Sequence, residues 1–163
     1  TLFACARYGN VVGSRGSVLP LFKNQRSSGT ITITNKRMTR FWLTLDEGVR
    51  FILQCIENMR GGEVFVPKIP SMRIMDLVAG VAPGCQVTFT GIRPGEKMHE
   101  VLVSEDEAHH TVELEDLYVI KPTHPWWSPE HWADAPLVPE GFRFTSDANK
   151  NWLSTEELKS LLP

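Results

Sequence analysis

The sequence begins with a strand, a glycine-spaced loop and an apolar helix, and this order constrains the fold more than any other feature. The pattern predicts a strand over about residues 3–7, a loop with glycines at positions 9, 13 and 16, and a helix over about residues 18–26. Glycines let the backbone approach a ligand closely, and the free N–H groups at a helix N-terminus attract anions. This arrangement can therefore hold a phosphate group, although a plain tight turn would explain the glycines equally well.

The loop lacks the signatures of two common phosphate-binding motifs. The run Gly13-Ser14-Arg15-Gly16 has no third glycine at the spacing of a dinucleotide fingerprint, and no acidic residue after it can be assigned the ribose-binding role. It is not a Walker loop either, because no Gly-Lys-Ser or Gly-Lys-Thr follows. Taken alone, the loop is weak evidence for a nucleotide site.

The rest of the sequence alternates between predicted strands and helices, which indicates an α/β or α+β fold. Strands are expected over residues 30–34, 63–66, 86–91 and 111–120, with a short extended piece over residues 41–44. Helices are expected over residues 46–59, 74–81 and 154–162, the last opened by a capping box. Within the helix over residues 46–59, the following apolar residues recur at helical spacing: Val49, Ile52, Leu53 and Ile56.

Composition excludes several classes of protein. With 42% hydrophobic and 22% charged residues, the chain of 163 residues is expected to form one compact domain or a small pair rather than a disordered segment. Its 17 basic and 19 acidic residues leave no positive excess for a nucleic-acid backbone. No apolar run reaches the roughly 18 residues of a membrane-spanning helix. Cys5, Cys55 and Cys85 match no zinc or disulfide pattern and are expected to be free thiols in a reducing cytoplasm.

Three arginines occupy settings that would suit a diphosphate. Arg15 lies in the glycine loop, Arg40 precedes a predicted extended segment, and Arg93 opens the predicted turn over residues 93–96. Guanidinium groups bind phosphate through paired charge-assisted hydrogen bonds. Glu96, three residues after Arg93, could accept hydrogen bonds from the vicinal hydroxyls of a ribose. From spacing alone, solvated surface residues remain the more common explanation for all four.

Two further clusters have ordinary explanations. His109 and His110, beside three acidic residues at 105–107, match no known ligand spacing of a metal site and are expected to form an exposed polar turn. The tryptophans between residues 126 and 132 could stack on a sugar, but aromatic packing over an irregular segment is the commoner arrangement. No Ser/His/Asp or Cys/His catalytic set can be assembled from the sequence.

Four segments and a short tail, in this order, resemble the inverting UDP-N-acetylglucosamine 4,6-dehydratases. The segments read RYGNVVGSRGSVLP from residue 7, MTRFWLTLDEG from residue 38, GGEVFVPKIPSM from residue 61 and GIRPGEKMHE from residue 91, with NWL at residues 151–153. These enzymes are extended short-chain dehydrogenases/reductases that open the pseudaminic acid pathway of flagellin glycosylation. The resemblance covers essentially the whole chain, but only the C-terminal half of the family's enzyme.

The resemblance implies the C-terminal part of a Rossmann-type α/β fold. About residues 1–30 and 43–66 would supply the last elements of its sheet, and about residues 67–163 the smaller UDP-sugar-binding domain and tail. The reaction implied begins with oxidation of C4 of the sugar of UDP-N-acetylglucosamine by bound NADP. Water is then lost across C5 and C6, and the hydride returns at C6 with inversion at C5. The full-length family enzymes form oligomers.

The resemblance also implies roles for individual residues. Asn10 would touch the substrate, while Tyr8 and Val11 would border the cofactor. The loop and helix start lining the UDP would be Arg15, Gly16, Ser17, Val18 and Leu19. The remaining contacts would be Thr34 near the uracil, Arg40 and Arg93 at the diphosphate, and Glu96 at the ribose.

The sequence departs from the family pattern in its catalytic parts. Neither the glycine fingerprint nor the Tyr-x-x-x-Lys pair is present, since Val12 follows Tyr8 and Pro122 follows Tyr118 at the lysine spacing. No catalytic residue is therefore assigned, and the chain alone is expected to be inactive. Because Leu2 already reads as part of a buried strand, the N-terminal half is expected to have been separated from this piece. The alternatives are a stand-alone UDP-binding module, one subunit of a split enzyme, or a related retaining dehydratase or epimerase.

Overall fold

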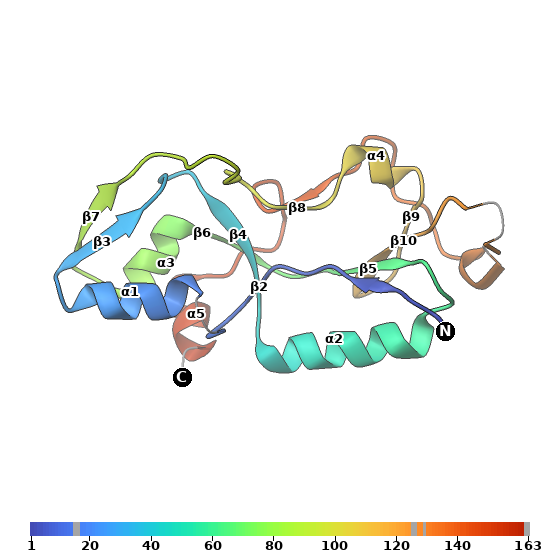
Figure 1. Ribbon diagram of the computed structural model, residues 1–163, viewed down its shortest axis with the longest axis horizontal. Helices are drawn as coiled ribbons and strands as arrows, with labels where there is room; N and C mark the ends of the chain where they lie inside the picture. Colours follow the sequence, from blue (N-terminus) through green and yellow to red (C-terminus); the bar gives the residue numbers. More distant parts are fainter. Residues whose placement is uncertain (15–16, 125–126, 129, 162–163) are drawn as a thin grey trace. The chain divides into compact units, whose positions relative to one another are not determined.

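The computed structural model describes residues 1–14, 17–124, 127–128 and 130–161 (Figure 1). Its helices are α1 (Val18–Arg26), α2 (Leu45–Asn58), α3 (Ile74–Val81), α4 (Glu105–Ala108) and α5 (Thr155–Leu161), with one 3₁₀ turn, η1 (Glu130–Trp132). Its strands are β1 (Cys5–Ala6), β2 (Asn10–Val11), β3 (Thr30–Ile33), β4 (Thr39–Leu43), β5 (Val64–Pro67), β6 (Ser71–Arg73), β7 (Gln86–Phe89), β8 (Val101–Val103), β9 (Thr111–Glu113), β10 (Leu117–Ile120) and β11 (Phe144–Thr145).

The chain forms two compact units that alternate along the sequence. The first unit comprises residues 1–8, 46–68 and 101–145, and the second comprises residues 9–45, 69–100 and 146–163. Both mix parallel and antiparallel strand pairs with helices, so the α/β class expected from the sequence is confirmed. The assignment of residues 1–30 and 43–66 to a Rossmann-type sheet, and of residues 67–163 to a sugar-nucleotide domain, stays a prediction.

The first unit is built on a four-stranded sheet in the order β1-β5-β10-β9. Strand β1 runs parallel to β5, whereas β10 is antiparallel to both β5 and β9. Helix α2 runs alongside β1 and β5 (Figure 1) and buries Phe51 and Cys55 against Phe65 and Trp132. A second antiparallel pair, β8 with β11, belongs to the same unit.

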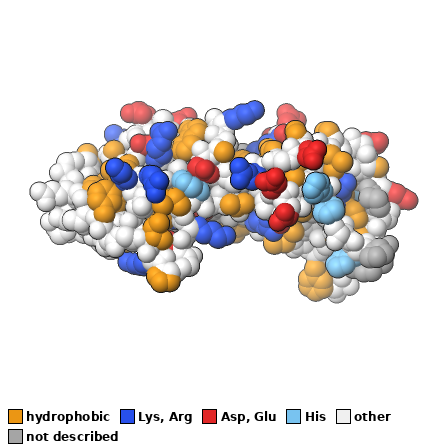
Figure 2. Space-filling view, turned by 90° about the horizontal axis from the view of Figure 1, so that it is seen from above, with side chains coloured by type: hydrophobic (Ala, Val, Ile, Leu, Met, Phe, Trp, Pro, Cys, Tyr) orange, Lys and Arg blue, Asp and Glu red, His pale blue; other side chains and the backbone are white. Residues whose placement is uncertain are grey.

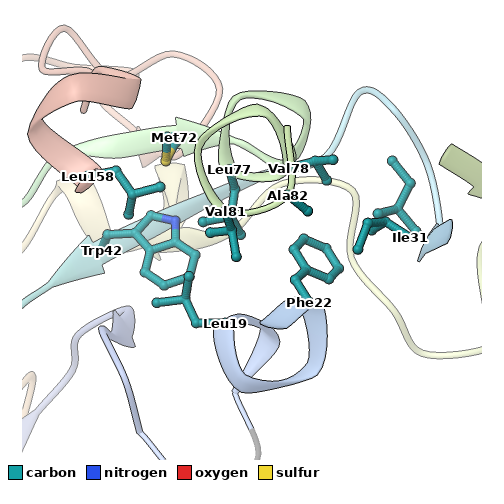
Figure 3. Close-up of a cluster of buried hydrophobic side chains, with 11 residues drawn as sticks. Leu19, Phe22, Ile31, Trp42, Met72, Leu77, Val78, Val81, Ala82 and Leu158 are labelled. Carbon is teal, nitrogen blue, oxygen red and sulfur yellow. The ribbon is translucent and has the colours of Figure 1, made fainter. Parts of the chain in front are cut away.

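The second unit has a three-stranded sheet in the order β2-β4-β6 and a parallel pair, β3 with β7. Figure 3 shows its core, in which Leu19 and Phe22 of α1 point toward the apolar side of α3, with Trp42 of β4 and Leu158 of α5 beside them. Fully burying a side chain of this size contributes about 1.5–3 kcal/mol. The core therefore fixes α1, the helix that follows the glycine loop, against α3.

Local signals predicted several elements well. The helices expected over residues 18–26 and 74–81 are found with those bounds. The capping box opening α5 is present, because the Ser154 N–H donates to the Glu157 carboxylate (2.8 Å) and the Glu157 N–H donates to Ser154 Oγ (3.2 Å). The turn over residues 93–96 is also confirmed by a hydrogen bond from the Glu96 N–H to the Arg93 carbonyl (3.0 Å).

Two strand predictions were wrong. Residues 111–120 form the hairpin β9–β10 instead of one strand, because the Leu114 N–H turns back to the Leu117 carbonyl (2.9 Å) over the exposed residues 115–116. The strand expected to be buried from Leu2 onward is a regular strand only at Cys5–Ala6, although the Phe3 carbonyl accepts the Gly62 N–H (2.6 Å) and the Arg7 N–H donates to the Phe65 carbonyl (2.8 Å). The side chains of Leu2 and Phe3 are exposed, so the expected burial is wrong. Among the described strands, β1 pairs only with β5, so Leu2 and Phe3 precede a strand at the edge of the sheet.

Helix α2 has two apolar faces, and its own unit covers one of them. Phe51 and Cys55 are buried, whereas Val49, Leu53 and Ile56 are 52%, 56% and 60% exposed. Together with Ile52, also exposed, these three residues are called the α2 apolar face below. The helical spacing recognised in the sequence is therefore real, but it marks a face that the described residues leave open.

The surface carries a mixture of charges. On the face drawn in Figure 2, acidic and basic side chains lie interspersed, in keeping with the formal net charge of -2. Among the described residues, no helix is both long enough and apolar enough to cross a bilayer.

Candidate functional site

A cavity of about 240 Å³ in the second unit brings together most of the side chains that the sequence singled out. The expected substrate residues on its lining are Asn10, Val18, Thr34, Arg40, Arg93 and Glu96. The apolar part of its wall is completed by Leu21, Phe22, Ile33, Met38 and Ile74. An apolar wall with a few convergent polar groups is the usual composition of a small-molecule site.

Asn10 reaches the cavity because Gly9 lets strand β2 approach strand β4 closely. A Cβ added to Gly9 would lie 2.5 Å from the Cβ of Phe41 and 2.7 Å from its carbonyl oxygen, so a larger residue does not fit. Asn10 is then paired in parallel register with Trp42. The Asn10 Nδ2 group donates to the Phe41 carbonyl (3.0 Å) and to the carboxylate of Glu100 (3.0 and 3.2 Å).

Glu100 is a part of this arrangement that sequence reasoning missed. Its carboxylate accepts the Phe41 N–H (2.8 Å) besides the Asn10 amide, and it lies 3.7 Å from Arg40 Nε. Only its place as the last residue of the GIRPGEKMHE segment marked it in the sequence. Its partners on β2 and β4 are distant in sequence, so no local pattern could have identified its role.

Arg40 uses its guanidinium mainly to hold protein groups. Nη1 donates to the carbonyls of Thr39 (2.7 Å) and Met98 (3.1 Å), Nη2 donates to the carbonyl of Lys97 (3.0 Å), and Nε faces Glu100. The side chain is only 19% exposed. Arg40 therefore ties the segment that precedes Glu100 to strand β4, and a bond to a diphosphate would require one of these contacts to be exchanged.

Arg93 is in the opposite situation. It is exposed, and within the described residues its guanidinium makes no hydrogen bond or ion pair, while its backbone N–H donates to Glu96 Oε2 (3.4 Å). Glu96 Oε1 in turn accepts a hydrogen bond from Thr34 Oγ1 (3.0 Å). The turn thus places an unengaged cation next to a carboxylate whose position is fixed by two donors.

The start of α1 contributes less than expected. Val18 lines the cavity, but Leu19 is 1% exposed and packs in the core of the unit. Ser17 is the N-cap residue of α1, and its hydroxyl is buried without a hydrogen-bond partner among the described residues. Arg15 and Gly16 lie outside the described residues.

The two residues expected to border the cofactor are not on the cavity lining. Tyr8 belongs to the first unit, is half-exposed and contacts Phe51 edge-on at 6.2 Å between ring centroids. Val11 is half-buried in β2 opposite Leu43. These two side chains, in a sequence with no dinucleotide fingerprint, are not enough by themselves to hold a nicotinamide dinucleotide.

The other clusters noted in the sequence are not on the cavity lining. His109 and His110 are exposed at the end of α4, and among the described residues no group of three His, Cys, Asp or Glu side chains could hold a metal ion. Trp132 is buried against Phe65, and its Nε1 donates to the buried Glu63 (3.4 Å). Trp127 packs against the same cluster, and Trp126 lies outside the described residues.

Comparison with solved structures places the fold among the Rossmann-type α/β proteins. The structure of Pen from Bacillus thuringiensis superposes with a TM-score of 0.82 and 33% identity, covering 98% of this chain and 49% of that one. The chain belongs to the polysaccharide biosynthesis protein family, whose model matches residues 1–122.

Curated relatives narrow the comparison. The chain is 44% identical to the inverting UDP-N-acetylglucosamine 4,6-dehydratase of Campylobacter jejuni, over 99% of this chain and 51% of that enzyme. It is 41% identical to the capsular polysaccharide biosynthesis protein CapD of Staphylococcus aureus, over 76% of this chain and 22% of that protein. The chain thus spans about half the length of the dehydratase that it matches, and a smaller share of CapD.

Proposed function

We propose that this chain is the UDP-sugar-binding part of a C5-inverting UDP-N-acetylglucosamine 4,6-dehydratase that serves surface glycan biosynthesis. The observation that carries the proposal is the cavity of the second unit, which brings Asn10 together with Arg93 and Glu96 of the distant turn over residues 93–96. The 44% identity to the Campylobacter dehydratase extends over all of these segments and supports the same assignment.

The cavity suggests a division of roles along the ligand. The unengaged guanidinium of Arg93 would bind the diphosphate, and Glu96 would accept the ribose hydroxyls. Thr34, which already donates to Glu96, would lie next to the uracil. Asn10 would contact the sugar. Arg40 would act on the diphosphate chiefly by holding the segment at residues 97–100 in place.

The start of α1 would close the UDP end of this site. Arg15, Gly16 and Ser17 would approach the phosphates through the loop, and Val18 would contribute the apolar wall that it already forms. Leu19 would act indirectly, by anchoring α1 to the core. The Ser17 hydroxyl, which is buried and has no hydrogen-bond partner among the described residues, would donate to such a ligand.

The chemistry itself requires groups that we do not find in this chain. We propose that NADP and the Tyr-x-x-x-Lys pair are supplied by the half of the dehydratase that this chain does not match, with Tyr8 and Val11 at the border of the cofactor. The α2 apolar face is a surface against which that half could pack. The product would enter pseudaminic acid synthesis for flagellin glycosylation, and the complete enzyme would be a cytoplasmic homo-oligomer. The three cysteines are unpaired, which supports a reducing compartment.

Calorimetric titration of the chain with UDP tests the binding role. We expect a dissociation constant in the micromolar range and a loss of about tenfold or more in Arg93→Ala, because one charge-assisted phosphate contact is removed. Arg50→Ala, an exposed arginine of α2, is the matched control and should bind as the wild type does. Absence of UDP binding by the wild-type chain would contradict the proposal.

Product analysis by NMR tests the division of labour. The chain alone should convert no UDP-N-acetylglucosamine, and mixing it with the separately expressed N-terminal half of the Campylobacter dehydratase should restore formation of the 4-keto product. Turnover by the chain alone would overturn the assignment of catalysis to the other half. Restored turnover would distinguish the subunit of a split enzyme from a stand-alone UDP-binding module.

A further inference from the structure

The side-chain amide of Asn10 is held in one orientation. One hydrogen of Nδ2 points to the Phe41 carbonyl (3.0 Å) and the other to the two carboxylate oxygens of Glu100 (3.0 and 3.2 Å). The Phe41 carbonyl can only accept a hydrogen bond, and the same is true of an ionised carboxylate such as that of Glu100. Turning the amide over would place Oδ1 against three oxygen atoms, so the neighbours determine which end is nitrogen.

Glu100 is itself fixed on two sides. Its Oε2 accepts the Phe41 N–H (2.8 Å), which belongs to strand β4. Its backbone N–H donates to Ser146 Oγ (2.8 Å), and its backbone carbonyl accepts the Ser146 N–H (2.9 Å). The Ser146 side chain is buried and bonds to Thr39 Oγ1 (2.7 Å). The carboxylate therefore has little freedom to follow the Asn10 amide if that amide rotates.

This arrangement leaves the oxygen end of the amide for a ligand. Asn10 lines the cavity, whereas Phe41 and Glu100, which receive its nitrogen, are not among the lining residues. The structure gives Oδ1 no hydrogen-bond partner among the described residues. An amide oxygen can only accept hydrogen bonds.

We propose that Glu100 is a specificity-determining positioning residue, which locks Asn10 so that the cavity selects a hydrogen-bond donor on the ligand. Given the proposed function, on which this inference rests, the donor is a hydroxyl or an acetamido N–H of the nucleotide-linked sugar. A phosphate, ring or keto oxygen at this position would face Oδ1 with no hydrogen between them. Glu100 acts only through Asn10 in this role, since it does not line the cavity.

Paired titrations with UDP and UDP-N-acetylglucosamine isolate the contribution of the sugar. In Glu100→Gln, the new side-chain NH₂ competes as a donor and the lock on Asn10 is lost, so affinity for UDP-N-acetylglucosamine should fall about tenfold more than affinity for UDP. Glu105→Gln, an exposed glutamate of α4, is the matched control and should leave both affinities unchanged. Equal losses for the two ligands, or no loss for either, would overturn the inference.

Asn10→Ala provides a second variant in case Glu100→Gln does not fold, which thermal unfolding will reveal. It removes the acceptor itself, so it should also lower affinity for the sugar nucleotide more than affinity for UDP. An unchanged ratio of the two affinities in Asn10→Ala would overturn the inference, because the amide oxygen would then contact no ligand group.

NMR of the ligand-free chain tests the lock without any ligand. The Nδ2 protons of Asn10, assigned by their loss in Asn10→Ala, should exchange slowly with water in the wild type and in Glu105→Gln. They should exchange faster in Glu100→Gln. If the wild type binds neither ligand, the proposed function fails, and slow exchange that persists in Glu100→Gln would separately refute the lock.

Discussion

Gly9 lies so close to Phe41 that a Cβ added to it would stand 2.5 Å from the Cβ of Phe41. The contact sets how β2 lies against β4, and it brings Asn10 to the cavity. We expect Gly9→Ala to lower the free energy of unfolding by about 1–3 kcal/mol, because backbone atoms of Phe41 would have to move. Urea denaturation measures this change. Ser14→Ala, an exposed substitution in the same loop, should change it by less than about 0.5 kcal/mol, and an equal effect of both would refute the steric explanation.

Arg40 should contribute to the stability of the fold, whereas Arg93 should contribute to ligand binding and not to stability. Arg40→Ala removes three bonds to backbone carbonyls and an ion pair from a mostly buried side chain, so we expect a loss of about 2 kcal/mol in unfolding free energy. Arg93→Ala removes no side-chain hydrogen bond or ion pair among the described residues and should cost less than about 0.5 kcal/mol. Chemical denaturation of both variants provides the comparison, and a greater loss in Arg93→Ala would contradict the assignment.

Glu107 should make stability depend on pH on the acid side. Burial by itself would raise the pKa of this carboxyl, but hydrogen bonds from the Ser104 N–H and from Arg7 outweigh it and hold the pKa below its ordinary value of 4.5. A lowered pKa in the folded state stabilises the fold above the unfolded-state pKa. This contribution disappears as the pH falls through the folded-state pKa.

Denaturation of the wild type and Glu107→Gln between pH 7 and pH 3 checks this expectation. The wild type should have the larger unfolding free energy at pH 7. The difference between the two proteins should decrease below about pH 4.5, as Glu107 becomes protonated in the folded and in the unfolded state. Glu105→Gln, in the same helix, should show no such narrowing. A gap that stays constant over the whole range would exclude an ionic contribution from Glu107.

Cys5 and Cys55 should differ in reactivity. Burial raises the pKa of the Cys55 thiol to about 11, so only about one molecule in a thousand carries the thiolate at pH 8. Cys5 is exposed. We expect a maleimide or disulfide reagent to modify Cys5 well before Cys55, as read by peptide mass spectrometry, with Cys5→Ser as the control that removes the fast phase. Modification of Cys55 at the rate of Cys5 would show that α2 is not packed as described.

The α2 apolar face should limit the solubility of the isolated chain. An exposed stripe of Val49, Ile52, Leu53 and Ile56 favours self-association, because burying it removes apolar surface from water. Leu53→Lys should reduce light scattering at high concentration with little change in unfolding free energy. Leu53→Ile, which keeps the face apolar, is the control. If scattering is the same in both variants, the face does not drive association.

Local structure was largely predictable from the sequence. Helices α1 and α3 have the bounds that apolar spacing and turn residues indicate, and Ser154 with Glu157 forms the capping box that its motif predicts. The hairpin at residues 111–120 was missed, because two short strands with the same alternation read as one. The exposure of the α2 apolar face could not be predicted from the sequence either, since spacing shows which side chains share a face but not what covers that face.

The candidate site was also predictable only in part. The sequence by itself determined which side chains are chemically suited to a nucleotide sugar, including Asn10, Arg93 and Glu96, because those choices depend on residue type and motif order. Only the tertiary structure decided that Arg40 is occupied by backbone carbonyls, that Leu19 is buried and that Glu100 orients Asn10. The physical reason is that a hydrogen bond or a buried contact depends on which segments meet in space, and Glu100 is 90 residues from Asn10.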